Sequence, residues 1–203
     1  MFGWFGWGIQ NSKNNLILYT KSVQYLYMED LIMTIIQRLI PGYTETDNVT
    51  GCCPVFHPEK YDNCVYDLSD YHFIKSSTLS FMYIPLNMDK VFIQTMQAID
   101  DSKQTYADRY LILSKDLNPF KCNHYFLVKG NVAGFALERI EGNYFTKVYE
   151  GDFKNISQWM KDFEILLKKQ GKNLRETFVF YTTCPNCAKV YGHNYVVLFG
   201  KIN

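Results

Sequence analysis

The spacing of hydrophobic and polar positions becomes regular from residue 72 onward and predicts one strand, one helix and two further strands. The first strand is expected over 72–86. Asn87 is a suitable N-cap for an amphipathic helix over 88–102, where apolar side chains recur every three or four positions. Strands are expected at 109–114 and 124–129, with a turn between them.

The same order of elements returns in the second half of the chain. A strand is expected over 136–150, a helix over 155–169, and strands over 177–182 and 194–201. Gly171 is suited to the position after the helix, where a left-handed residue is common. The apolar side chains of this helix share one face: Ile156, Trp159, Met160, Phe163, Leu166 and Leu167.

Two equivalent units in one sequence are typical of an internal duplication. In each unit the apolar face of the helix and the apolar face of the sheet cover each other. We therefore predict an α+β fold for residues 72–203, in which duplicated β-α-β-β units form a pseudo-symmetric antiparallel sheet with two helices on one face. Because ligands usually bind between subdomains, the cleft between the repeats is the expected site.

The chain before residue 72 does not follow this repeat. Residues 1–45 contain an N-terminal segment in which glycines alternate with bulky aromatic residues, followed by an apolar stretch that predicts a helix over 23–40. Pro41-Gly42 ends that helix, and residues 46–71 are expected to form an irregular linker. Such an apolar helix must pack on its own domain or on a partner, so we treat this extension as a candidate docking element.

Composition and charge narrow the classes of function. The hydrophobic fraction of 47% and the charged fraction of 20% indicate a folded chain with a real core. A net charge of +1 gives no global electrostatic reason to bind nucleic acid or anionic lipid. No apolar stretch approaches the ~20 residues of a transmembrane span. Without a recognisable secretory signal, we expect an intracellular protein, cytoplasmic or alternatively mitochondrial.

Cysteines provide the sharpest chemical feature. For an intracellular chain with six cysteines, reduced thiols or a metal site are favoured over disulfides. Cys184 and Cys187 have the spacing at which two thiolates share one zinc ion, and Cys52 and Cys53 are the candidates to complete the site, with His57 or His193 as substitutes. Because adjacent cysteines rarely both bind one ion, the alternative set is one of Cys52 and Cys53 together with His193. A redox dithiol and an inert turn are the alternatives. The redox interpretation is weakened by the position of the pair in a predicted strand-to-strand turn.

Several motifs resemble those of a known family. Gly-Cys-Cys-Pro stands at 51–54, Ile-Pro-Leu-Asn at 84–87, and Thr-Thr-Cys-Pro-Asn-Cys-Ala-Lys-Val-Tyr-Gly-His-Asn-Tyr-Val-Val at 182–197. Val-Tyr-Glu-Gly-Asp-Phe at 148–153 looks like a strand-end element of the GyrI-like small-molecule-binding superfamily. The chain from about residue 50 to 203 is similar to a bacterial branch of that superfamily that is often labelled hydrolase.

The resemblance implies binding of a small hydrophobic or aromatic molecule in the cleft between the repeats, with possible hydrolase activity. It makes Glu150 the candidate catalytic carboxylate, as a general base or as a partner for a cationic ligand. The candidate ligand-binding aromatics are Tyr83, Tyr149, Trp159 and Tyr181, although packing beneath its helix is the favoured interpretation for Trp159.

Two other functions stay open at the level of sequence. The chain could be a non-catalytic structural or accessory subunit that keeps the fold and docks other protein subunits through residues 1–40. Haem binding occurs in related proteins, but no axial ligand stands out in this sequence.

Overall fold

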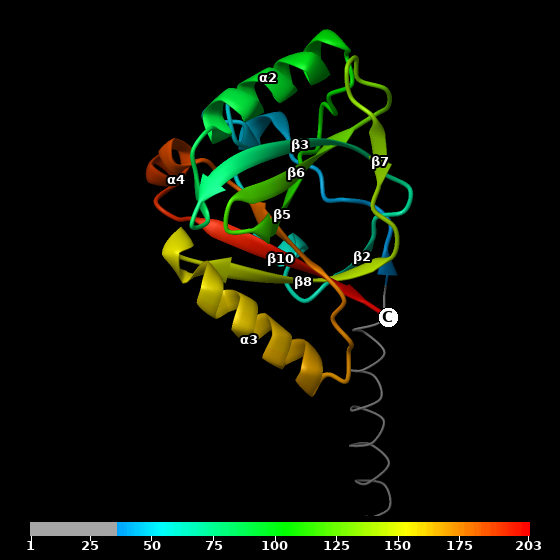
Figure 1. Ribbon diagram of the computed structural model, residues 1–203, viewed down its shortest axis with the longest axis vertical. Helices are drawn as coiled ribbons and strands as arrows, with labels where there is room; N and C mark the ends of the chain where they lie inside the picture. Colours follow the sequence, from blue (N-terminus) through cyan, green and yellow to red (C-terminus); the bar gives the residue numbers. More distant parts are fainter. Residues whose placement is uncertain (1–35) are drawn as a thin grey trace, which may run out of the picture. The chain divides into compact units, whose positions relative to one another are not determined.

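A computed structural model describes residues 36–203. The aromatic segment and most of the helix predicted over 23–40 lie outside these residues. Within the described part, ten strands form a sheet in the order β1-β2-β8-β10-β9-β5-β6-β3-β4, with β7 paired to β3 (Figure 1). The strands are β1 Ile36–Gln37, β2 Val65–Asp67, β3 His72–Phe81, β4 Ile84–Pro85, β5 Ile112–Asn118, β6 Lys121–Val128, β7 Leu137–Arg139, β8 Asn143–Glu150, β9 Thr177–Tyr181 and β10 Tyr195–Ile202.

The sheet confirms the predicted duplication. The first repeat runs β3, α2 (Met88–Asp101), β5 and β6, and the second runs β8, α3 (Ile156–Lys169), β9 and β10. Their central strands follow the mirrored order β8-β10-β9 and β5-β6-β3. The repeats therefore meet at a seam between β5 and β9, where Ser114 pairs with Val179.

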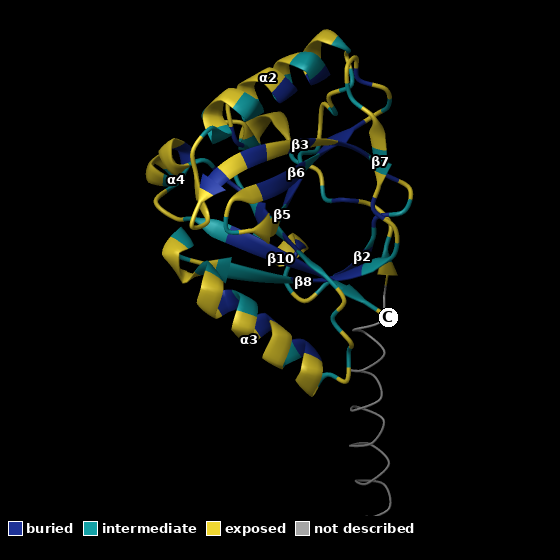
Figure 2. Ribbon diagram, viewed as in Figure 1, coloured by how far each residue is buried: buried dark blue, intermediate teal, exposed yellow. Residues whose placement is uncertain are grey.

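Both long helices cover the same face of this sheet. Helix α3 packs on a cluster that includes Phe145, Val179 and Leu198, and α2 packs on one that includes Ile112. Ser114 lies on the same face as Ile112 because alternate residues of a strand share a face. Since Ser114 lies opposite Val179 in the ladder, both clusters belong to one face. Each helix turns its buried residues toward the sheet and its exposed residues outward (Figure 2).

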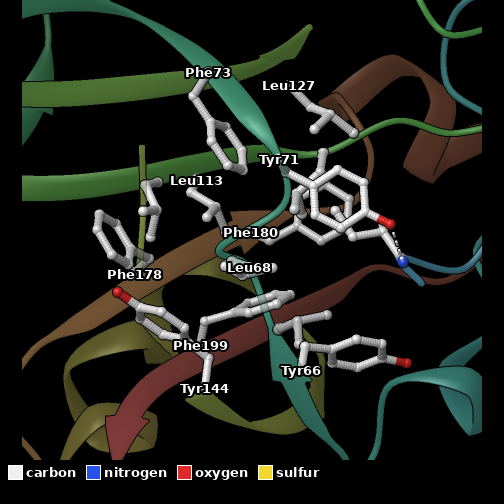
Figure 3. Packing of buried hydrophobic residues seen from close by; sticks show 14 of the residues in the cluster. Tyr66, Leu68, Tyr71, Phe73, Leu113, Leu127, Tyr144, Phe178, Phe180 and Phe199 are labelled. Carbon is white, nitrogen blue, oxygen red and sulfur yellow. Dashed lines mark hydrogen bonds between the residues drawn. The ribbon is translucent and has the colours of Figure 1, made fainter. Parts of the chain in front are cut away.

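The opposite face of the sheet is covered by the chain that precedes the first repeat. Tyr61, Tyr66, Leu68 and Tyr71 are buried there against side chains of the central strands. The Tyr71 hydroxyl also accepts a hydrogen bond from the Ile40 backbone N–H at 2.9 Å. Figure 3 shows this cluster, including Phe73, Leu113, Leu127, Tyr144, Phe178, Phe180 and Phe199. The sheet is thus enclosed by helices on one side and by residues 40–71 on the other.

Residues 46–71 are therefore more than the linker expected from sequence. Most of the segment is irregular, with the 3₁₀ turns η1 (Glu45–Asp47) and η2 (Pro58–Lys60). It also contains β2, which pairs antiparallel with β8 and extends the sheet. Its backbone is irregular, so the aromatic residues that it turns toward the core are not spaced as in a helix or a strand.

The start of the described chain corrects the predicted helix over 23–40. Residues 36–40 are not helical; Ile36 and Gln37 form β1, which pairs in parallel with β2. Of the apolar residues in 36–40, Ile40 is buried, whereas Ile36 and Leu39 are exposed. Short apolar runs cannot be assigned to helix or strand by periodicity alone.

Two long predicted strands are each broken in the structure. The strand predicted over 72–86 is a hairpin of β3 and β4, because Met82 and Tyr83 have φ values of 50° and 69° and reverse the chain. The strand predicted over 136–150 divides into β7 and β8, with Gly142 at φ 106° before β8. The strands predicted at 109–114 and 124–129 are β5 and β6, which extend toward each other and turn at Pro119-Phe120.

Candidate functional site

The Cys184–Cys187 pair lies at the start of a helix, which corrects the strand-to-strand turn expected from sequence. Helix α4 spans Pro185–Tyr191 and has Cys184 as its N-cap. Gly192, with φ 77°, follows the last helical residue. Proline at the first helical position and glycine after the last one are the local signals for such a helix. The argument against a redox dithiol that rested on the turn is therefore removed.

Four cysteines from two distant parts of the chain converge beside this helix. The sulfur atoms of Cys52, Cys53, Cys184 and Cys187 all lie within 4.8 Å of one another. The Sγ atoms of Cys52 and Cys53 are 3.6 Å apart. Four thiolates around a tetrahedral zinc, with Zn–S bonds of about 2.3 Å, would place their sulfurs roughly 3.8 Å apart. The cluster therefore has dimensions that suit a metal ion.

The histidines considered as substitute ligands are engaged elsewhere. His57 Nε2 lies 2.9 Å from a carboxylate oxygen of Asp47. The ring of His193 packs against the ring of Tyr195, with centroids 5.1 Å apart. The neighbouring cysteines Cys52 and Cys53 both reach the cluster, so the set of donors is four sulfurs.

Hydrogen bonds orient the sulfur atoms. The backbone N–H of Cys184 donates to Cys53 Sγ at 3.3 Å, and that of Cys187 donates to Cys184 Sγ at 3.5 Å. Burial raises the pKa of Cys53 well above its usual range. Burial also acts to raise the pKa of Cys187, but hydrogen bonding with Thr50 and the Cys53 backbone outweighs it and lowers that pKa to about 7. Four thiolates this close repel one another, so a bound cation would stabilise the arrangement.

An aromatic pocket lies next to the cysteine cluster, at the seam between the repeats. Its floor includes Tyr110, beside β5, and Phe180 of β9, whose ring centroids are 5.8 Å apart. Phe56 and Tyr61 stack over this floor with centroids 5.2 Å apart. The volume of the pocket is about 30 Å³. The lining consists of Pro41, Gly42, Tyr43, Pro54, Val55, Phe56, His57, Lys60, Tyr61, Tyr110, Phe180 and Thr182.

The pocket and the cluster are close neighbours. Pro54 lines the pocket and directly follows Cys53 in the chain. Burial raises the pKa of Tyr110, and the nearby sulfurs of the cysteine cluster raise it further. A change in the position or charge of the cysteine sulfurs would therefore alter the surroundings of the pocket residues Pro54 and Tyr110.

The candidate catalytic residue, Glu150, lies on the pocket side of the sheet. It is exposed at the end of β8, opposite Tyr195 of β10. It shares a face with Val148, which packs against the cluster between the sheet and residues 40–71. Tyr195 in turn lies 5.6 Å, between ring centroids, from the pocket residue Phe56. Burial raises the pKa of Tyr195, and the charge of Glu150 adds to this effect.

The candidate ligand-binding aromatics do not converge with Glu150. Tyr149 stacks on Trp159 beneath α3, with centroids 5.5 Å apart. Tyr181 also lies on the helix-covered face, in the same cluster as both. Tyr83 is exposed at the tip of the β3–β4 hairpin. Three of the four thus share one face, and Glu150 belongs to the other.

Three aromatic residues of the pocket, Phe56, Tyr61 and Tyr110, lie outside the helices and strands and were not predicted from the sequence as site residues. Phe56 and Tyr61 lie in the segment expected to be a linker, and Tyr110 precedes the first residue of β5. The available signal was the density of aromatic residues just after the Gly-Cys-Cys-Pro motif at 51–54. No periodicity connects these positions, so only the folded chain brings them together.

A family model described as "Bacterial hydrolase" matches residues 43–202. No curated protein matches the sequence. A solved structure titled "The structure of SAV2435 bound to TETRAPHENYLPHOSPHONIUM" is similar with a TM-score of 0.41 and 11% identity, over 68% of this chain and 92% of that one. Across residues 36–203, no helix combines the length and apolar character needed to cross a membrane.

Proposed function

The chain belongs to the bacterial hydrolase family. We propose that it binds a small hydrophobic or aromatic molecule in the pocket at the seam between its repeats. The observation that carries the proposal is the convergence of four aromatic rings at that seam, from Phe56, Tyr61, Tyr110 and Phe180. Ligand sites are mostly apolar and aromatic, with a few polar groups that set orientation. His57, Lys60 and Thr182 would be those groups here.

Binding would require the pocket to enlarge. Its volume of about 30 Å³ holds roughly one water molecule, whereas ligand pockets usually have about 300–1,000 Å³. In the floor, Phe180 is fixed by the pairing of β9 with β10, and Tyr110 lies two residues before β5. The roof belongs to residues 41–61, which we call the covering segment. We infer that the covering segment moves aside when a ligand enters.

Hydrolysis is the finer part of this proposal. Glu150 is the candidate general base, because it lies on the pocket side of the sheet and its neighbour Tyr195 contacts Phe56 at the pocket. In this role the carboxylate would take a proton from a water molecule that attacks the bound substrate. A Glu150→Gln variant would then bind with unchanged affinity but turn over at least about a hundredfold more slowly.

We further propose that the four cysteines hold one zinc ion with a structural role. Four thiolates fill a tetrahedral site and leave no position for substrate or water. The redox alternative needs only Cys184 and Cys187, whereas a metal accounts for all four sulfurs lying within 4.8 Å. Elemental analysis of purified full-length protein tests this. We expect about one zinc per chain, its loss in Cys52→Ser, and its retention in Cys64→Ser, where the cysteine lies outside the cluster.

Calorimetry with tetraphenylphosphonium and a neutral aromatic probe, N-phenyl-1-naphthylamine, tests the binding proposal. Phe180 and Phe178 are both buried in β9 and point to the same face, but only Phe180 lines the pocket. Phe180→Leu should weaken binding about 2- to 10-fold through lost ring contacts, while Phe178→Leu serves as the matched control. Equal losses of affinity in the two variants would disprove the location of the ligand in the seam pocket. If neither probe binds to the wild type or to either variant, the small-molecule-binding function is disproved.

The alternative function, an accessory subunit of a larger assembly, is favoured by a different observation. Large apolar side chains are exposed together on the β3–β4 hairpin and the adjacent β5–β6 turn, where the rings of Phe81 and Phe120 lie 6.4 Å apart. Contiguous exposed apolar surface often marks a protein interface. A full-length chain that is soluble only with a co-purifying subunit would support this function over small-molecule binding. The exposed set is Leu79, Phe81, Met82, Tyr83, Ile84, Leu86, Leu117 and Phe120.

A further inference from the structure

We propose that the metal at the four-cysteine cluster acts as a clamp that holds the covering segment over the seam pocket, so that metal occupancy controls ligand access. This inference rests on the proposed function and adds its regulation. It is argued from how the covering segment, residues 41–61, is attached to the rest of the protein.

Both ends of the covering segment are attached by hydrogen bonds outside the cysteine cluster. At its start, the Tyr43 backbone N–H donates to the carbonyl oxygen of Asp108 at 2.7 Å. At its end, the Thr146 hydroxyl donates to the carbonyl oxygen of Tyr61, and the Tyr66 hydroxyl donates to that of Lys60, each at 2.5 Å. These attachments do not involve the cysteines, so they would persist without a metal.

The middle of the covering segment is attached at the cluster. Cys53 accepts the Cys184 backbone N–H on its sulfur at 3.3 Å, and its carbonyl oxygen accepts the Tyr191 hydroxyl at 2.5 Å. The Oγ1 atom of Thr50 lies 3.3 Å from Cys187 Sγ and 3.3 Å from the Tyr191 hydroxyl. All of these partners belong to Cys184 or helix α4. The middle of the roof is thus held to α4 at one place.

That attachment stands directly beside the roof of the pocket. Pro54, Val55 and Phe56 follow Cys53 and line the pocket, and Thr182 lines it two residues before Cys184. The backbone N–H of Val55 donates to the carbonyl oxygen of Asp47 at 2.8 Å, which closes residues 47–55 into a local loop. Movement at Cys52 and Cys53 would therefore carry Phe56 with it.

The cluster can be a strong attachment only when a cation is present. A divalent ion bonded to four thiolates joins the two parts of the chain with four bonds. Without it, the same sulfurs offer weak hydrogen bonds, and any thiolates repel one another. The remaining links of the middle segment are then the few hydrogen bonds of Cys53 and Thr50 and the packing of Phe56 against Phe180 and Tyr195. The open form would become more populated, and apparent affinity rises in proportion to the competent fraction.

The experiment compares full-length protein loaded with zinc and stripped of it. Hydrogen exchange is measured for peptides covering 41–61 and, as an internal reference, for strands β3 and β6. Binding of N-phenyl-1-naphthylamine is followed by fluorescence. Zinc removal should raise exchange in the covering segment at least 10-fold, leave the two strands unchanged, and raise probe affinity at least 5-fold. Cys52→Ser should behave like stripped protein, and Cys64→Ser like loaded protein.

The outcomes separate the clamp from the binding function. Unchanged exchange in 41–61 after zinc removal would overturn the clamp, even if the probe binds. Exchange that rises equally in β3 and β6 would show a general structural site and would also overturn it. Equal or weaker probe binding by stripped protein contradicts controlled access. If exchange in 41–61 rises but neither form binds the probe, the clamp stands and the proposed small-molecule function fails.

Discussion

The backbone N–H of Cys184 donates a hydrogen bond to Cys53 Sγ at 3.3 Å, although the two residues lie 131 positions apart in sequence. This contact joins the covering segment to the start of α4 in the second repeat. It brings two sequence motifs, Gly-Cys-Cys-Pro at 51–54 and Cys-Pro-Asn-Cys at 184–187, to one site. Because the aromatic pocket adjoins this site, the proposed metal site and the proposed ligand site are neighbours.

The first prediction concerns Trp159, whose ring is buried beneath α3 and stacks on Tyr149. Trp159→Leu should lower the free energy of unfolding by about 2–4 kcal/mol, because it leaves a cavity in the core. Ile165→Ala, at an exposed position of the same helix, should change it by less than about 0.5 kcal/mol. Denaturant unfolding measures both. Affinity for tetraphenylphosphonium should be the same in Trp159→Leu as in the wild type. Weaker binding by the folded variant would indicate that Trp159 contacts the ligand.

A second prediction concerns the buried His124. Its Nε2 lies 2.9 Å from the Thr78 hydroxyl and its Nδ1 lies 2.8 Å from the Ser114 hydroxyl. Burial lowers the pKa of His124 from 6.5 to about 4. The unfolded chain therefore binds a proton at higher pH than the folded protein does. The contribution of His124 to the free energy of unfolding should therefore be at its maximum above pH 6.5. It should decrease as the pH falls toward 4, by up to about 3 kcal/mol.

The test is the pH dependence of the unfolding free energy in wild type and His124→Gln. Glutamine keeps hydrogen-bonding groups for Ser114 and Thr78 but does not titrate. The variant should be less stable at pH 7 yet lose less stability between pH 6.5 and 4. Parallel curves for the two proteins would show that His124 titrates normally in the folded state.

A third prediction concerns Gly200 in β10. A Cβ atom at this position would come within 2.6 Å of Phe163 Cε1 and 2.9 Å of Leu174 Cδ1. Gly200→Ala should therefore destabilise the protein by about 1–3 kcal/mol through overpacking against α3. Gly130→Ala is the control, since its nearest neighbour is the movable end of the Gln104 side chain at 3.2 Å. Thermal unfolding compares the two variants. If their melting temperatures are equal, α3 moves away from the added methyl group without loss of stability.

A fourth prediction concerns the β3–β4 hairpin. Met82 and Tyr83 form its two-residue turn, with both φ values positive. Such turns favour Asn-Gly, and side chains of other residues are strained there. The double change Met82→Asn with Tyr83→Gly should stabilise the isolated domain by about 1 kcal/mol. Leu86→Asn removes exposed apolar surface without altering the turn and should be close to neutral. A destabilised double variant would mean that these side chains make contacts that matter.

The local pattern predicted the repeated elements well. Helices α2 and α3 begin and end within one residue of the predicted ranges, because a sustained apolar face with a cap defines a helix locally. The α+β fold with two helices on one face is also confirmed. Helix α4 was missed because its seven residues are too few to show a period. The breaks at Met82-Tyr83 and before Gly142 depend on backbone angles that the hydrophobic pattern does not report.

The sequence by itself predicted the duplication and pointed to Cys184 and Cys187 as a pair, with Cys52, Cys53 and two histidines as candidate partners. Both depend on local information: the spacing of apolar residues within an element, and the chemistry of thiols at a given separation. Only the tertiary structure decided what covers each face of the sheet. Phe56, Tyr61 and Cys53 come from chain without periodicity, and they reach Phe180 and Cys184 because the sheet brings distant segments together. The hydrophobic effect that buries aromatic side chains is non-directional. Which rings come together therefore depends on the whole fold rather than on residues that are neighbours in sequence.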